Sequence, residues 1–464
     1  MKAISLVLTA AFVTANPITS RAQTLNVVHA FTAADYTEEV FTNVDGAHPY
    51  GSLVLSGNTL FGTTEVGGEG MGTIFSVNED GSGYTVFHTF QGGWDGSAPY
   101  SGLAISGNTL YGTTPAGAGT VYSINTDGSG YQVLHAFDTN LWGGGPYAAL
   151  AVSGGVLYGA TQNSLFSLDT GGSNFTTLHA FSSSAYNASV KLYTNWDGTT
   201  CMASLAVDGT NIYGTAYQGG SNGCGTLFAL NSDGSNFTVL HSFGSGSDAA
   251  NPWAGLVLAG GALYGTTYNG GTNGGGTLFA INTDGSGYTL LHHFGISPDG
   301  ANPRENLILS GGTLYGTTSS GGANGAGIVF SICTNGTGYS ILRALDNSPD
   351  GDIPLAGLAL AGNTLYGTAS EGGTNGTGTV FSLSLPGAAI ASFGIQGTSL
   401  IVNATNGIAG ANYTVLASAN VLLPMRQWTT VASGTFDANG NSNLMATNAV
   451  DPAATRAFYR LRMQ

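Results

Sequence analysis

The sequence is poor in charged residues, in cysteine and in long apolar runs. Charged residues make up 7% of the 464, against about 25% in ordinary soluble domains. The 25 acidic side chains outnumber the 9 basic ones, and the net charge of −16 disfavours binding to nucleic acid or to anionic membranes. No stretch reaches the roughly 18 apolar residues of a membrane-spanning helix. We therefore expect no nucleic-acid partner and no transmembrane segment in the mature chain.

The N-terminus, residues 1–22, has the pattern of a secretory signal peptide. Lys2 provides the basic start, residues 3–15 form an apolar region, and Ser20-Arg21-Ala22 is a small-x-small cleavage site, with Val13-Thr14-Ala15 competing. We expect the mature chain to be secreted or held at the cell surface. A buried N-terminal strand or helix is the alternative interpretation.

Glycine and aromatic residues are abundant, and they occur in repeats. The sequence holds 75 Gly, 21 Tyr and 21 Phe, a composition that favours short strands joined by tight turns. One block, Leu-Tyr-Gly-Thr-Thr or a close variant, occurs seven times. Its central glycines are spaced by 50, 47, 55, 51, 51 and 51 residues, at Gly62, Gly112, Gly159, Gly214, Gly265, Gly316 and Gly367.

Each repeat reads as four strands. In the fifth repeat we expect them at residues 254–258, 262–267, 276–281 and 288–294, with an Asp-Gly hairpin turn before the last strand. Four strands in a repeat of about 50 residues indicate the blades of a β-propeller. Helical repeats are disfavoured because glycine and threonine at this density oppose helix formation.

A count of the strands predicts how the ring closes. Third strands occur at Phe75, Tyr122, Phe166, Phe228, Phe279, Phe330 and Phe381, but only six of them precede a fourth strand. The segment Leu25–Phe31 has the fourth-strand pattern of Val239–Phe243. We therefore predict an all-β chain with a seven-bladed propeller over residues 23–387, in which the N-terminal strand completes the last blade and removes its open edge.

These blocks also resemble a known family. The recurring Leu-Tyr-Gly-Thr-Thr, the Gly-rich block ending in Gly-Thr-hydrophobic-Phe, and Asp-Gly-Ser-Gly-Tyr-x-x-Leu-His-x-Phe are similar to the GloVer (Gloeo/Verruco) tandem repeats of exported bacterial proteins. The resemblance covers about residues 25–385. It implies export and a surface or extracellular setting, with no catalytic activity and no defined ligand.

Residues 388–464 form a separate C-terminal module. The Gly-Gly loops stop there, and we expect strands at 399–404, 413–417, 428–432, 443–447 and 457–462, which together suggest a small antiparallel β-sandwich. Its elements resemble C-terminal modules of exported bacterial proteins, which are thought of as attachment or secretion domains. The module carries no hydrophobic tail and no sortase-like motif.

Two sets of polar residues recur with the repeats. Histidines at one position of the fourth strand are His29, His88, His135, His179, His241 and His292, and Arg343 takes that position in the sixth repeat. We expect each to bond to a neighbouring turn, because outer strands hold them too far apart to share a metal. Acidic residues in the loops leading to the next repeat are Asp45, Asp95, Asp197, Asp248, Asp299 and Asp350.

These aspartates are ligand-binding candidates, because loops before the first strands approach the channel mouth, where carboxylates bind cations or sugar hydroxyls. The plainer reading is that Asp-Gly makes the turn. Exposed aromatics on the same face, above all Trp253 and also Trp94, Trp142 and Trp196, suit carbohydrate, although packing also explains tryptophan. The Gly-rich loops 219–225 and 270–276 lack the lysine and helix of a phosphate loop.

The three cysteines allow one disulfide. Cys201 and Cys224 map to one face of the same blade, so we predict that they pair after export, leaving Cys333 over. No catalytic motif, metal site or cofactor site is recognised. We therefore expect a non-catalytic recognition or adhesion protein whose partner is an extracellular glycan or surface protein. The alternatives are a polysaccharide hydrolase or lyase working at the channel mouth, and a structural envelope component.

Overall fold

The computed structural model describes residues 23–33, 35–37, 40–117, 119–137, 145–385, 389–396, 399–405, 412–418, 427–436, 442–447 and 458–463. The expected signal peptide, residues 1–22, lies outside these ranges. Within them the chain is all-β, and the only named helical element is the 3₁₀ turn η1 (Gly93–Asp95). In this described part, no helix is long and apolar enough to cross a membrane.

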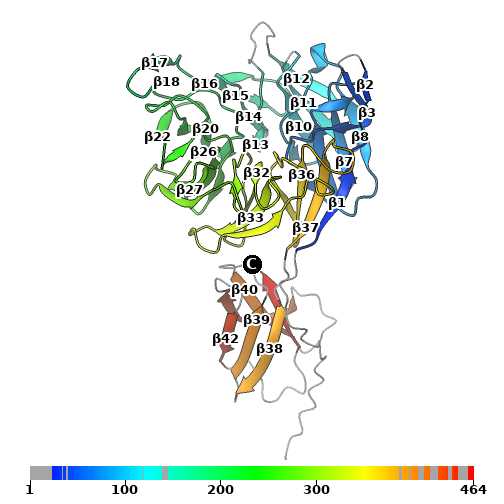
Figure 1. The fold of residues 1–464 in the computed structure, drawn as a ribbon, viewed down its shortest axis with the longest axis vertical. Helices are drawn as coiled ribbons and strands as arrows, with labels where there is room; N and C mark the ends of the chain where they lie inside the picture. Colours follow the sequence, from blue (N-terminus) through cyan, green and yellow to red (C-terminus); the bar gives the residue numbers. More distant parts are fainter. Residues whose placement is uncertain are drawn as a thin grey trace, which may run out of the picture.

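Most strands belong to seven four-stranded antiparallel sheets, each numbered here by its repeat. Figure 1 shows them following one another around a common centre. Sheets 1 to 3 contain β4 (Val54–Ser56), β5 (Thr59–Thr64), β7 (Thr73–Asn78) and β8 (Thr85–Thr89); β9 (Ala104–Ser106), β10 (Thr109–Thr114), β11 (Thr120–Asn125) and β12 (Gln132–Ala136); and β13 (Ala151–Ser153), β14 (Val156–Ala160), β15 (Ser164–Asp169) and β16 (Thr176–Ala180).

The remaining four sheets repeat this order. They contain β19 (Ala206–Val207), β20 (Asn211–Ala216), β21 (Thr226–Asn231) and β22 (Thr238–Ser242); β24 (Val257–Ala259), β25 (Ala262–Thr267), β27 (Thr277–Asn282) and β28 (Thr289–His293); β30 (Ile308–Ser310), β31 (Thr313–Thr318), β33 (Ile328–Cys333) and β34 (Ser340–Ala344); and β35 (Ala359–Ala361), β36 (Thr364–Ala369), β37 (Thr379–Ser384) and β1 (Leu25–Ala30).

Further strands lie in the loops outside the seven sheets. A three-stranded sheet comprises β2 (Asp35–Thr37), β3 (Val40–Ala47) and β6 (Val66–Gly68), and three pairs comprise β17 (Ala185–Asn187) with β18 (Leu192–Thr194), β23 (Ala249–Ala250) with β26 (Asn269–Gly270), and β29 (Gly300–Ala301) with β32 (Ser320–Gly321). The β17–β18 hairpin accounts for the longest repeat spacing, because it inserts residues between sheets 3 and 4.

Sheet 7 joins the two ends of the repeat region. Its outer strand β1 pairs antiparallel with β37, with Leu25 opposite Leu383 and Ala30 opposite Thr379. The following residue, Phe31, is fully buried and its ring packs edge-on against Phe75 of sheet 1, 5.5 Å between centroids. The N-terminal segment therefore contributes to the cores of both the first and the last sheet.

The glycine of each repeat is required by an aromatic ring. Gly62 lies opposite Phe75 across the β5–β7 pair, and a Cβ added to Gly62 would come within 2.6 Å of the Phe75 ring and 2.9 Å of Leu53. Gly265 meets Phe279 and Leu256 at similar distances. The seven aromatic residues of the third strands are all fully buried at these places, so the ring covers the glycine and fixes the leucine that leads into the first strand.

Neighbouring sheets are joined by apolar clusters and by threonine hydrogen bonds. Leu53 and Phe75 of sheet 1 pack with Tyr366 and Val380 of sheet 7 in one buried cluster. In five sheets the penultimate residue of the second strand is a threonine whose hydroxyl donates a hydrogen bond to a backbone carbonyl in the loop of the following sheet. The pairs are Thr63 to Ser101, Thr113 to Ala148, Thr215 to Ala254, Thr317 to Ala356 and Thr368 to Pro49.

The C-terminal region contains two three-stranded antiparallel sheets, separate from the seven in Figure 1. Their strands are β38 (Ala389–Gln396), β39 (Ser399–Thr405) and β42 (Ser442–Ala446), and β41 (Thr429–Thr435), β40 (Asn412–Ser418) and β43 (Phe458–Met463). Buried side chains from both sheets, including Val402 and Val415, form one cluster. Sequence analysis anticipated five of these strands and missed β38.

Removal of β1 tests its contribution to stability. We expect a chain that begins at residue 33 to melt about 10 °C or more below a chain that begins at residue 23, because it loses the β1–β37 ladder and the buried Phe31 ring. Thermal unfolding followed by circular dichroism measures the difference. Coincident melting curves would show that β1 adds nothing to the stability of the sheets.

Candidate functional site

The candidate aspartates and the recurring histidines form pairs. In five of the six cases the Nε2 atom of the histidine faces the carboxylate of the loop that follows, at 3.1 Å for His29–Asp45, 3.2 Å for His88–Asp95, 3.0 Å for His179–Asp197 and His292–Asp299, and 4.0 Å for His241–Asp248. In the sixth repeat Arg343 donates to Asp350 instead. Each of these aspartates therefore points towards the outer strand of the sheet that precedes its loop, and they do not converge on a common site.

Backbone N–H groups donate further hydrogen bonds to these carboxylates. Asp95 accepts the N–H of Gln91 at 2.9 Å, and Asp197 accepts the N–H of Ser182 at 2.9 Å. Asp45, Asp95, Asp197 and Asp350 are each at most 6% exposed. Burial alone would raise the pKa of Asp45, but hydrogen bonds from His29 and Thr32 outweigh it and lower that pKa. These carboxylates stabilise the turns in which they lie.

The histidines also link adjacent sheets. Each ring stacks on an aromatic ring of the next sheet, with centroids 3.7–3.9 Å apart, in the pairs His29–Tyr84, His88–Tyr131, His135–Phe175, His179–Phe237, His241–Tyr288 and His292–Tyr339. Tyr339 in turn donates to the Asp299 carboxylate at 2.5 Å. In the third repeat, whose loop has no aspartate, burial lowers the pKa of His135. Its ring stacks on Phe175 and meets Phe137 edge-on.

Substitution of a paired aspartate separates this structural role from ligand binding. We expect Asp197→Ala to lower the free energy of unfolding by about 1–3 kcal/mol, because His179 and the Ser182 N–H lose a buried acceptor. The exposed turn residue Asp284 supplies the control, Asp284→Ala, with a loss below about 1 kcal/mol. Equal losses in urea titrations of the two variants would contradict the structural role.

The structure does not contain the disulfide that was predicted between Cys201 and Cys224. Cys201 and Cys224 are both free, buried thiols. Cys201 packs in a cluster with Tyr158 and Leu205, whereas Cys224 packs in a different cluster with Leu227 and Phe243. The two loops do lie near each other, since Thr199 and Gln218 form a β-bridge, but the two cysteines belong to different buried clusters.

The exposed tryptophans do not form one surface with Trp253. Trp94 is 74% exposed and Trp196 is 59% exposed, and neither lines a cavity with Trp253, which is half-buried. Trp142 lies outside the described residues. In the described part of the chain, no three His, Cys, Asp or Glu side chains are grouped as a metal site. Of the candidate ligand-binding residues, only Trp253 lies at the cavity described next.

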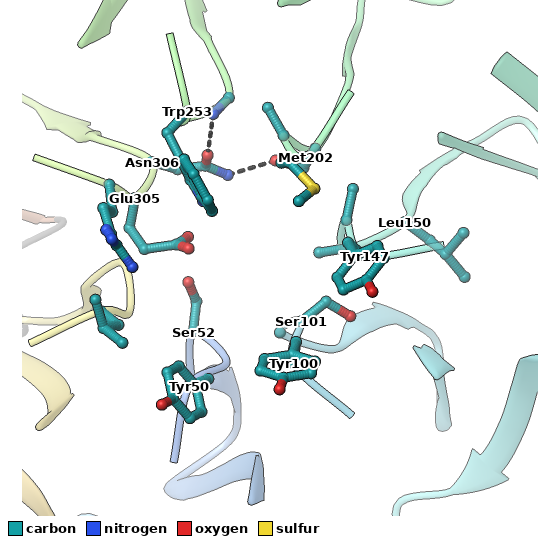
Figure 2. Close-up of a pocket in the computed structure, with 18 of the residues that line it drawn as sticks. Tyr50, Ser52, Tyr100, Ser101, Tyr147, Leu150, Met202, Trp253, Glu305 and Asn306 are labelled. Atoms are coloured by element: carbon teal, nitrogen blue, oxygen red, sulfur yellow. Dashed lines mark hydrogen bonds between the residues drawn. The ribbon is translucent and has the colours of Figure 1, made fainter. Parts of the chain in front are cut away.

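A cavity of about 500 Å³ lies between the loops that lead into the first strands. Such a volume is typical of sites for small ligands. The residue that begins each lining segment is a tyrosine in the first three repeats and differs among the other four. The seven are Tyr50, Tyr100, Tyr147, Met202, Trp253, Arg304 and Leu355. Three neighbouring tyrosines occupy one side, with ring centroids 5.3 Å apart for Tyr50–Tyr100 and 5.9 Å apart for Tyr100–Tyr147. Aromatic rings with polar edges therefore surround part of the opening (Figure 2).

Hydrogen bonds across the repeats hold the polar residues of the cavity. Asn306 accepts the N–H of Gly255 at 2.6 Å and donates to the hydroxyl of Ser204 at 2.5 Å. On the other side, Ser52 accepts the N–H of Gly357 at 2.8 Å. These bonds join the loops of the fourth, fifth and sixth repeats to one another, and the loop of the first repeat to that of the seventh. They give the cavity a defined polar wall.

Glu305 is the acidic residue of the cavity lining. Figure 2 shows its carboxyl group extending into the space between the loops, towards Ser52. Burial raises the pKa of Glu305 to about 8, because the Asn306 N–H, the charge of Arg304 and the Ser52 hydroxyl offset it only in part. Glu305 is therefore mostly protonated at neutral pH, and its carboxyl group can both donate and accept hydrogen bonds.

Arg304 is held by two aromatic rings. The carbon of its guanidinium lies 4.8 Å from the ring centroid of Trp253 and 4.8 Å from that of Tyr268, both typical of cation–π contacts. Tyr217 packs edge-on against Trp253, 4.8 Å between centroids. Trp253 therefore supports Arg304 and is itself contacted by Tyr217.

Sequence analysis missed Arg304, Glu305 and Asn306. The signal was the departure of the sixth repeat, Pro303-Arg-Glu-Asn-Leu307, from the small residues that follow the first lining position elsewhere, as in Pro252-Trp-Ala-Gly-Leu256. The structure shows a matching irregularity. Thr266 of sheet 5 is buried, and among the described residues its hydroxyl has no hydrogen-bond partner, whereas the equivalent threonines of five sheets donate to the next loop.

The raised pKa of Glu305 predicts a pH-dependent cost in stability. Below pH 4.5 both folded and unfolded chains hold the proton, and as the pH rises to about 8 only the folded chain keeps it, so folding becomes less favourable. We expect Glu305→Gln to match the wild type at pH 4. Above pH 8 it is more stable by roughly 2–4 kcal/mol, a range that allows for partial contact with solvent. Denaturant titrations at several pH values measure this, and a constant difference would contradict it.

Comparisons with known proteins agree with the repeat pattern. The sequence model of the Gloeobacter/Verrucomicrobia repeat matches residues 18–202 and 200–416, a range that extends beyond the end of the seven sheets into the C-terminal strands. No curated protein matched the chain.

Several solved structures resemble the fold at low identity. They include oligogalacturonate lyase from Vibrio parahaemolyticus (12% identity, 79% of this chain and 97% of that chain, TM-score 0.46), PorZ, a surface component of the type-IX secretion system of Porphyromonas gingivalis (12%, 92% and 60%, 0.48), and a nidogen/laminin complex (14%, 73% and 98%, 0.38). All three TM-scores lie below 0.5, so these likenesses support no inference about activity or ligand.

Proposed function

The chain belongs to the Gloeobacter/Verrucomicrobia repeat family, and from this premise we propose that it is an exported recognition protein that binds glycans in the cavity between its seven sheets. The observation that carries the proposal is the composition of the cavity wall. Tyrosine rings and their hydroxyls stand beside Ser52, Asn306 and a protonated Glu305. Aromatic faces next to hydrogen-bonding groups suit sugars, which present both C–H faces and hydroxyl groups.

The architecture that we propose for this function is a closed seven-bladed propeller over residues 23–387. Each four-stranded sheet would be one blade, and β1 would close the ring through its pairing with β37. Residues 1–22 would direct export and be removed, and residues 388–464 would form a sandwich module that attaches or helps export the propeller. Closure matters for the site, because it would hold the seven lining segments in fixed positions around one cavity.

A second candidate function rests on Glu305. A carboxyl group that keeps its proton near neutral pH suits a general acid, and glycoside hydrolysis needs such a group beside the scissile bond. The known mechanisms also need a second carboxylate, 5–10 Å away. Glu305 is the acidic residue of the described cavity lining, and this favours recognition over hydrolysis.

A glycan array with the whole chain from residue 23 tests the proposed function. We expect binding to a subset of glycans, which Tyr100→Ala weakens about tenfold because a ring between two other tyrosines is lost. Trp94→Ala is the matched control, since Trp94 is exposed and lies outside the cavity lining; we expect no change.

The other functions give different results in the same experiment. Cleavage of a bound glycan that stops in Glu305→Gln while binding persists would favour the enzyme. No binding to any glycan by the wild-type chain would overturn glycan recognition and favour a structural role in the envelope. Binding that Trp94→Ala abolishes and Tyr100→Ala leaves intact would place the site outside the cavity.

A further inference from the structure

The cavity contains an arginine without a counter-ion. Arg304 is the lining residue with a full positive charge. No described carboxylate lies within 4.0 Å of its guanidinium, whereas seven other pairs of basic and acidic side chains lie within that distance. The other described arginine of the seven sheets, Arg343, donates to Asp350 through two nitrogens. A lone arginine stands out in a chain with 25 acidic and 9 basic residues.

The contacts of Arg304 leave its hydrogen-bonding edge available. A guanidinium offers five N–H donors in its plane, and the rings of Trp253 and Tyr268 contact its faces. One terminal nitrogen reaches the Tyr268 hydroxyl at 3.4 Å, and within the described structure Nε is buried without a partner. The aromatic rings therefore fix the position of the charge without using most of its donors.

The neighbouring Glu305 does not neutralise this charge. Because burial raises the pKa of Glu305 to about 8, the carboxyl group is mostly neutral at pH 7 and presents an O–H donor beside the guanidinium. Glu65, whose charge acts on Tyr50 and Tyr100, accepts a hydrogen bond from the Tyr100 hydroxyl at 2.5 Å. Arg304 therefore brings a positive charge and an unsatisfied Nε donor to the cavity lining, and the tyrosine rings of the first three repeats form another part of that lining.

We propose that Arg304 makes the cavity selective for acidic glycans, and that its guanidinium binds the carboxylate of a uronic acid residue. Arginine and carboxylate match in geometry, since two parallel N–H groups can meet the two oxygens. Glu305 donates a further hydrogen bond to the same carboxylate or to an adjacent hydroxyl, and the tyrosines contact the sugar rings that follow. This inference rests on the proposed function and names the chemical class of its ligand.

Isothermal titration calorimetry with matched oligosaccharides tests the inference. The probes are oligomers from polygalacturonate, alginate and hyaluronan, each as the free acid and as its methyl ester, with the whole chain from residue 23. The ester keeps the sugar and removes the charge. We expect at least one acid to bind about tenfold or more tightly than its ester, because a charge-assisted hydrogen bond is lost in the ester.

Variants then assign the selectivity to Arg304. We expect Arg304→Gln to remove the difference between acid and ester, and Arg304→Lys to restore part of it, since a lysine keeps the charge and loses the planar fork. Lys191→Gln is the control, because it makes the same change of charge at an exposed position outside the cavity. Melting curves check that each variant is folded; the comparison of acid with ester on the wild-type chain needs no variant.

The outcomes separate this inference from the proposed function. If every acid binds no more tightly than its ester, or if Arg304→Gln keeps the full preference, selection by Arg304 is overturned, and neutral glycans bound on the array would leave glycan recognition standing. If neither acids, esters nor array glycans bind, both proposals fail together.

Discussion

The contact between a strand glycine and the aromatic ring opposite it determines the rest of the fold. In every sheet the ring of the third strand occupies the space where a Cβ of the second-strand glycine would lie, as Phe75 does over Gly62. The same ring touches Leu53, the residue that leads into the first strand. Because Leu53 is thereby fixed, the preceding residues have little freedom, and two of them, Tyr50 and Ser52, line the cavity. A buried core contact thus sets the position of a functional loop.

The polar residues that recur most strictly act on the outside of the sheets. His88 pairs with Asp95 and stacks on Tyr131 of the next sheet, so one histidine satisfies a buried carboxylate and also fills the junction between two sheets. Several of the few acidic side chains of this chain therefore pair with histidines at the junctions between sheets. The remaining charges near the cavity are few, and the effect of Arg304 is greater because it has no paired carboxylate.

Sequence reasoning located the strands well because turn chemistry and repetition both constrain them. The second strand of the fifth repeat was expected at 262–267 and has those bounds. The first strand was expected at 254–258 but spans Val257–Ala259. The residues before it belong to the cavity loop, where Ala254 accepts a hydrogen bond from the fourth repeat and Gly255 donates one to the sixth. The site was not predictable in the same way. The repeat pattern indicated Asp45 and its equivalents, whereas the cavity depends on Arg304 and Glu305, which break the pattern. It also depends on contacts between loops about 100 residues apart, such as that of Asn306 with Ser204.

Differences among the repeats therefore carry more information about the ligand than their similarities do. Seven identical lining segments would produce a cavity with the same chemistry on every side, which suits a symmetrical ligand or a single ion. Here neighbouring tyrosines occupy one part of the wall and the Trp253–Arg304–Glu305 group another. Such a wall distinguishes the two ends of a ligand, one by ring contact and one by charge and hydrogen bonding. An asymmetric molecule with both apolar faces and an acidic group matches that division, and the constant scaffold allows the lining residues to vary without loss of the Gly62–Phe75 type of contact.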